Sequence, residues 1–180
     1  TSELYVSAAS PEEAGRLTTG LQNEVDAILP VQAATINLGG IPTELFGARD
    51  HATYRENWTF LQSVPAPWDQ VVAGEAVIVN EQLYRRAGYE VGDEVEIGDQ
   101  TLSIVGVYGD YGNPIGQAVM TESLFRSLYP EVTPLRFGLR IPEADVDRVR
   151  AVMTEDIGIP DAQIINQAAL KAFSTSIFDR

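Results

Sequence analysis

The stretch AVIVNEQLYRRAGYEVGDEVEIGDQTLSIVGVYGDYGNPIGQAVM, residues 76–120 of this 180-residue chain, decides the expected fold. Its apolar opening predicts a strand. Asn80 follows as an N-cap, because its side-chain oxygen can accept a hydrogen bond from a free amide of the next helix. Gly88 stands where a helix ends in a left-handed residue. Residues 91–97 turn the chain and then alternate apolar with acidic side chains, which indicates a half-buried strand.

The second half of this stretch predicts two more strands. Gly98 and Asp99 are expected to close a hairpin onto residues 101–108, whose β-branched side chains favour a strand. A glycine-rich connection then leads to an apolar strand that ends at Met120. The glycine spacing matches neither nucleotide-binding fingerprint, and no Lys-Ser or Lys-Thr pair follows. We therefore interpret the connection as a loop between strands of a small, curled or barrel-like sheet.

The order of these motifs resembles the extracytoplasmic core domain of FtsX-like (MacB-type) permeases, the membrane subunits of a class of ABC transporters. Three runs carry the likeness: Asn-Glu-Gln-Leu-x-Arg-Arg-x-Gly from Asn80, Val-Gly-Asp-Glu-Val-Glu-Ile from Val91, and Ile-Val-Gly-Val-Tyr from Ile104. Residues 3–7 look like the first extracytoplasmic strand of that family, and residues 176–180 look like the lead-in to its second membrane helix. The resemblance therefore spans nearly the whole chain.

The resemblance implies a non-catalytic periplasmic domain of a cell inner membrane protein, with membrane helices before Thr1 and after Arg180. Such a domain transmits the conformational change driven by a separate cytoplasmic ABC ATPase. The implied partners are that ATPase, a second permease subunit in a dimer, and a periplasmic lipoprotein, adaptor or cargo. Exposed loops between strands often carry recognition, so the predicted partner contact is the loop formed by Asp110, Tyr111, Gly112 and Asn113.

The alternative function is a stand-alone soluble module that binds a ligand or a protein. Turn-plus-strand signals such as Val-Gly-Asp-Glu-Val also occur in unrelated β-barrel modules. A well-formed pocket lined by Trp58 or Trp68 would favour this alternative. The other interpretation of these two tryptophans is that they fill a core or a junction between lobes.

Composition excludes several chemistries. The net charge of −14 repels phosphate backbones, so no nucleic-acid partner is expected, although such a charge also serves solubility. The chain has no cysteine and one histidine, His51, which lacks an identifiable nucleophile or orienting partner. We predict no catalytic residue, no metal site and no cofactor.

Two helices are expected to lie in similar surroundings. In the first, Ser10 is the cap, Pro11 takes the first helical position and Glu13 completes a capping box. Its buried stripe is predicted to contain Ala14, Leu17, Leu21, Val25 and Ile28. The second helix carries Val146, Val149, Met153 and Ile157 on one face and ends at Gly158. Each helix follows an apolar strand and runs to a proline, Pro30 or Pro160, before another strand.

These repeated strand–helix–strand halves predict an α+β fold with a split βαβ, porter-like lobe. We assign residues 1–65 and 131–180 to this lobe. An inserted, β-rich and barrel-like lobe is assigned to residues 66–130, because Pro65 and Pro67 interrupt regular structure. That lobe is expected to end in a short helix capped by Thr121. Residues 168–178 are expected to form an amphipathic helix.

Overall fold

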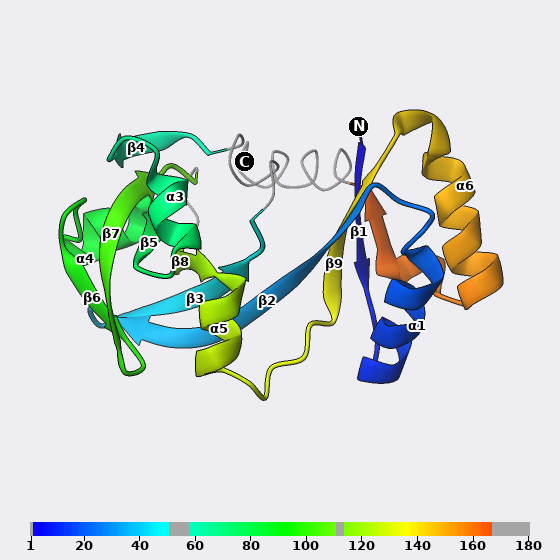
Figure 1. Cartoon of the computed structure of the whole chain (residues 1–180), viewed down its shortest axis with the longest axis horizontal. Coiled ribbons are helices and arrows are strands. Elements are labelled where there is room, and N and C mark those ends of the chain that lie inside the picture. Colours follow the sequence, from blue (N-terminus) through cyan, green and yellow to red (C-terminus); the bar gives the residue numbers. More distant parts are fainter. Residues whose placement is uncertain (1, 51–57, 111–113, 167–180) are drawn as a thin grey trace. The chain divides into compact units, whose positions relative to one another are not determined.

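A computed structural model describes residues 2–50, 58–110 and 114–166 of the chain (Figure 1). The expected helix over 168–178, His51 and residues 111–113 lie outside this part. Contacts divide the chain into unit 1, Thr1–Val31 with Thr133–Arg180, and unit 2, Gln32–Val132. Residues 32–65, assigned from sequence to the first lobe, fall within unit 2. The reason is strand pairing, since residues 32–38 form a hairpin with residues 41–47, and the second strand of this hairpin joins the sheet of unit 2.

Unit 1 contains a four-stranded antiparallel ladder. Its order is β10 (Ile164–Asn166), β1 (Ser2–Ser7), β9 (Arg136–Ile141) and the first part of β2 (Ala27–Leu38). The two halves interleave, because β2 of the first half pairs with β9 and β10 of the second half pairs with β1. This is the split βαβ arrangement, and the expected α+β class is confirmed.

Helix α1 (Pro11–Leu21) packs on this sheet through its apolar stripe. Its capping box differs from the expected one. Ser10 Oγ accepts from the Glu13 amide at 3.1 Å, but the Glu13 carboxylate accepts from the Ala9 amide and not from that of Ser10. The predicted extension of the stripe to Val25 and Ile28 is wrong, because α1 ends at Leu21. Ile28 instead lies in β2, where pairing with β9 satisfies the backbone.

The second helix of unit 1 is built from three turns of different pitch. A 3₁₀ turn η1 (Glu143–Asp145) leads into α6 (Val146–Ala151), and a π-helical turn η2 (Val152–Ile157) ends at Gly158, whose φ is 84°. A short 3₁₀ turn, η3 (Asp161–Gln163), precedes β10. Gly158 thus ends the helix as predicted. Pro30, however, lies inside β2 and does not delimit it.

In the described part of unit 2, a mixed sheet is accompanied by three short helices. From the second part of β2, the order is β3 (Ile41–Ala48), β8 (Gly116–Thr121), β5 (Ala76–Asn80), β7 (Gln100–Tyr108) and β4 (Phe60–Ser63), while β6 (Glu94–Ile97) pairs with β7. The helices are α3 (Pro67–Val72), α4 (Glu81–Ala87) and α5 (Glu122–Leu128). The strand, helix and hairpin expected over residues 76–120 are confirmed.

Two predictions about side chains in unit 2 have different outcomes. The core interpretation of the tryptophans is confirmed, because Trp68 is 5% exposed and its ring stacks on that of Trp58, with centroids 6.1 Å apart. Trp58 in turn packs against Tyr108 at 4.7 Å. The prediction that Thr121 caps α5 is correct only in position, since its side chain forms no capping hydrogen bond.

Candidate partner-binding surface at the β7–β8 connection

The connection between β7 and β8 is the site that sequence singled out for partner contact. The structure describes one of the four predicted residues, Asp110, and places it two residues after the end of β7. Tyr111, Gly112 and Asn113 lie outside the described residues. Ile115, on the other side of the connection, is 42% exposed, which is unusual for a large apolar side chain in this chain.

Asn80 holds both ends of this connection. Its side chain is fully buried at the end of β5. The amide nitrogen donates to Asp110 Oδ2 at 2.6 Å and to the carbonyl of Ile115 at 3.0 Å. The amide oxygen accepts from the backbone N–H of Gln117 at 2.9 Å, and from that of Leu83 at 3.4 Å as the cap of α4. One side chain therefore joins the strand, the helix and the connection.

Arg86 is a second anchor that sequence reasoning missed. Its Nη1 donates to the carbonyl of Pro114 at 2.8 Å. Its neighbour Arg85 instead pairs with Glu81 at 3.0 Å along the same helix. No periodicity separates these two arginines, so only the position of Pro114 in space distinguishes them.

Close packing supports the connection from beneath. Gly116 begins β8, and a Cβ added there would lie 2.5 Å from Thr43 Oγ1 and 2.9 Å from Leu83 Cδ2. The Tyr108 hydroxyl donates to Gln117 Oε1 at 2.8 Å, which links the last residue of β7 to the second residue of β8. The flanks of the connection are thus fixed by both hydrogen bonds and packing.

The electrostatics of the connection are set by burial. Burial raises the pKa of the Asp110 carboxyl, opposed by the hydrogen bond from Asn80, and nearby Glu81 raises it further. Oδ1 of Asp110 is buried and has no hydrogen-bond partner. Burial also raises the pKa of the Tyr108 hydroxyl, with the charges of Asp110 and Glu44 adding to the effect. This region therefore presents a carboxylate that favours a hydrogen-bond donor or a proton.

A charged cluster elsewhere in unit 2 holds secondary-structure elements together. Arg49 binds the Glu122 carboxylate in a two-pronged contact at 3.1 and 3.2 Å, and Arg126 pairs with the same carboxylate at 2.5 Å. Burial raises the pKa of Glu122, but the hydrogen bond and charge of Arg49, together with the charge of Arg126, outweigh it and lower the pKa overall. Arg126 also donates to buried Gln32 at 3.3 Å. The cluster joins β2, the end of β3 and α5.

Within residues 2–50, 58–110 and 114–166, no three His, Cys, Asp or Glu side chains gather in a way that could hold a metal ion. In the same ranges no helix is both long and apolar enough to cross a membrane.

The split βαβ ladder of unit 1, with the second unit built from the residues between its halves, defines a fold class. It is the fold of extracytoplasmic domains of ABC-type transporters. No protein-family model matches the sequence, and no curated protein matches it either. The fold class therefore comes from solved structures.

Two crystal structures show the likeness over almost the full length. The periplasmic region of MacB from Actinobacillus actinomycetemcomitans is 12% identical, with a TM-score of 0.61 over 97% of this chain and 92% of that one. The extracellular domain of the noncanonical ABC-type transporter YknZ from Gram-positive bacteria is 9% identical, with a TM-score of 0.57 over 92% of this chain and 98% of that one. At these identities the likeness concerns the fold, and at that level it confirms the resemblance to MacB-type domains.

Proposed function

We propose that this chain is the extracytoplasmic domain of an ABC transporter permease subunit in the cell inner membrane, and that it transmits motion without catalysing a reaction. The observation that carries this proposal is the whole-length fold likeness to the MacB and YknZ domains. The proposed partners are a cytoplasmic ATPase coupled through membrane helices, a second permease subunit, and a periplasmic lipoprotein, adaptor or cargo.

Transmission requires that a displacement at one part of the domain reach another part. Strand β2 supports this role, because its residues Ala27–Val31 pair with β9 of unit 1 and Gln32–Leu38 pair with β3 of unit 2 in one unbroken strand. We propose that unit 2 is an inserted, barrel-like lobe, with its β-rich part over residues 66–130. The β7–β8 connection, from Asp110 to Ile115, is the proposed partner contact.

A topology experiment tests the location. Because the chain has no cysteine, Glu96→Cys on the exposed side of β6 introduces a single label site in it. In the full-length gene product, with cysteines elsewhere replaced, a membrane-impermeant maleimide is expected to label this position in cells whose inner membrane is intact. Labelling only after that membrane is permeabilised would contradict the proposal.

A distance measurement tests the transmission. Glu96→Cys, on the exposed side of β6, receives a spin label in the full-length transporter, and double electron–electron resonance is recorded between the two proposed permease subunits with and without trapped ATP. Transmission predicts a distance distribution that changes with nucleotide. An identical distribution in both states would contradict the proposal.

A further inference from the structure

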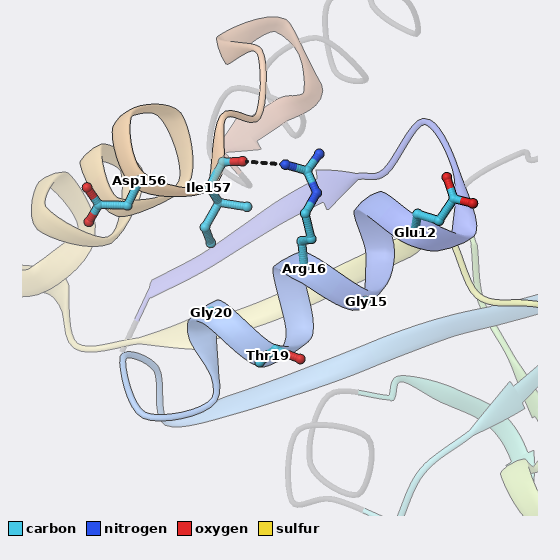
Figure 2. A pocket seen from close by; sticks show the side chains of 7 residues that line it. All are labelled: Glu12, Gly15, Arg16, Thr19, Gly20, Asp156 and Ile157. Carbon is cyan, nitrogen blue, oxygen red and sulfur yellow. Dashed lines mark hydrogen bonds between the residues drawn. The ribbon is translucent and has the colours of Figure 1, made fainter.

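A groove in unit 1 lies on surface that the proposed function does not use. It has a volume of about 640 Å³ and runs between α1 and η2 (Figure 2). Its lining consists of Glu12, Gly15, Arg16, Thr19, Gly20, Asp156 and Ile157. A volume of this size can receive several side chains of another molecule.

Two glycines of α1, Gly15 and Gly20, contribute to the lining of the groove. Gly20 allows close packing of α1 on η2, because a Cβ there would lie 2.7 Å from Ile157 Cδ1. Gly15 is different, since a Cβ at that position would meet nothing within 4 Å. Glycine disfavours a helix interior, so no contact inside the chain explains Gly15. A bare backbone at this point lets another backbone approach closely.

The charged side chains that line the groove are Glu12, Asp156 and Arg16, so its net charge is negative and favours a cation. Glu12 and Asp156 lie at opposite ends of it (Figure 2), both are exposed, and neither has an ion-pair partner within the described part of the chain. The carboxyl end of η2, where helix carbonyls carry partial negative charge, points into the same space. It already attracts one guanidinium, because Arg16 Nη1 donates to the Ile157 carbonyl at 3.0 Å.

We propose that this groove binds a cationic segment of a partner protein, with lysine or arginine side chains directed at Glu12 and Asp156 and the partner backbone against Gly15. The net charge of −14 argues for this occupant over a second copy of the chain, because two such acidic surfaces repel each other. The inference concerns a surface other than the β7–β8 connection, and its test uses the 180-residue chain, so its outcome is independent of membrane topology.

The test is an NMR titration of the ¹⁵N-labelled chain with a defined probe. The probe is a helical, alanine-based peptide with three lysines, and the same peptide with three glutamates is the control. Chemical-shift changes are expected at Gly15, Thr19, Gly20 and the turn over residues 152–158, for the lysine peptide alone, and they should diminish in high salt. Changes spread over the whole acidic surface, or equal binding of both peptides, would overturn the proposal.

Matched variants distinguish binding at the groove from attraction by the overall negative charge of the chain. The double variant Glu12→Gln with Asp156→Asn is expected to weaken binding about fivefold, because exposed ion pairs are individually weak. Glu94→Gln with Glu96→Gln removes the same charge from the exposed face of β6 in unit 2 and should leave the affinity unchanged. An equal loss of affinity in both double variants would show that binding depends on net charge alone, and would refute the site.

A steric variant tests the role of Gly15. Gly15→Leu points into open space and improves helix propensity, so the protein should fold and melt at a higher temperature while its affinity for the peptide falls. Ser123→Leu, at an exposed position of α5, is the matched control and should bind as the native chain does. Unchanged binding by Gly15→Leu, or shifts at the groove caused by raising the concentration of the chain alone, would overturn the proposal.

Discussion

Removing the side chain of Asn80 should destabilise unit 2 more than any other single truncation of a polar residue in it. Asn80→Ala deletes all four hydrogen bonds of a fully buried side chain. Loss of the cap of α4 costs about 1 kcal/mol. Leaving the partly buried N–H of Gln117 without a partner costs about 1–3 kcal/mol. The carbonyl of Ile115 lies near the surface, where water can replace the lost donor, so we add nothing for it.

The expected loss in free energy of unfolding is therefore about 3 kcal/mol. Urea unfolding followed by tryptophan fluorescence measures it, because Trp58 and Trp68 are the only tryptophans of the chain and both belong to unit 2. With a slope of about 2 kcal/mol per molar urea, the midpoint should fall by about 1.5 M. Asn37→Ala, at an exposed position of β2, is the matched control and should change stability by less than about 0.5 kcal/mol.

A loss below about 1 kcal/mol for Asn80→Ala would refute the reasoning, because it would equal an ordinary substitution. Asn80→Asp then separates the role of the side chain as a hydrogen-bond donor from its role as an acceptor. It keeps the acceptor for Leu83 and Gln117 but loses the donor and places a second carboxylate beside Asp110. Its stability at neutral pH should fall between those of the native chain and Asn80→Ala, and should recover as the pH is lowered.

Three further outcomes are expected. Burial raises the pKa of Asp110 above its ordinary 3.8, so the folded state gains stability as pH falls from 7 toward that value. Asp110→Asn should thus be slightly more stable at pH 7, by less than about 1 kcal/mol because the carboxyl is partly exposed, and its urea midpoint should depend less on pH. Glu122 has the opposite sign: its lowered pKa stabilises the fold at neutral pH, and this contribution disappears as pH falls below 4.5. Glu122→Gln should cost about 1 kcal/mol at pH 7 and little at pH 3, and an equal cost at both would exclude an ionic origin. Gly116→Ala should cost about 1–3 kcal/mol in thermal unfolding, because its Cβ would overlap Thr43 and Leu83, whereas Gly15→Ala, in open space, should gain up to about 1 kcal/mol.

Sequence reasoning succeeded where the signal is local. The cap at Asn80, the left-handed end at Gly88 with φ of 75° and the alternation of exposed and buried residues along β6 each depend on hydrogen bonds or side-chain directions within a few residues. It failed where a local signal competes with a distant partner. Pro30 reads as a strand limit, yet pairing with Phe137 on β9 keeps it inside β2.

The candidate site divides in the same way. The glycine-rich composition of the β7–β8 connection is visible in the sequence. Its anchors could not be predicted, because the bonds from Asn80 to Asp110 and Gln117 join residues 30 and 37 positions apart. The distinction between Arg85 and Arg86, and the groove over Gly15, likewise depend on which elements become neighbours.

The sequence by itself determined the α+β class, the order of the elements and the acidic, cysteine-free chemistry of the chain. Periodicity, caps and turn residues are signals between residues close in sequence, so they can be recognised without a structure. Only the tertiary structure decided the boundary between units at Val31 and Gln32, the clamp around Asn80 and the groove between α1 and η2. The reason is that sheet register and helix packing bring together groups that share no local signal, and their free energies depend on contacts that form only when the whole ladder is assembled.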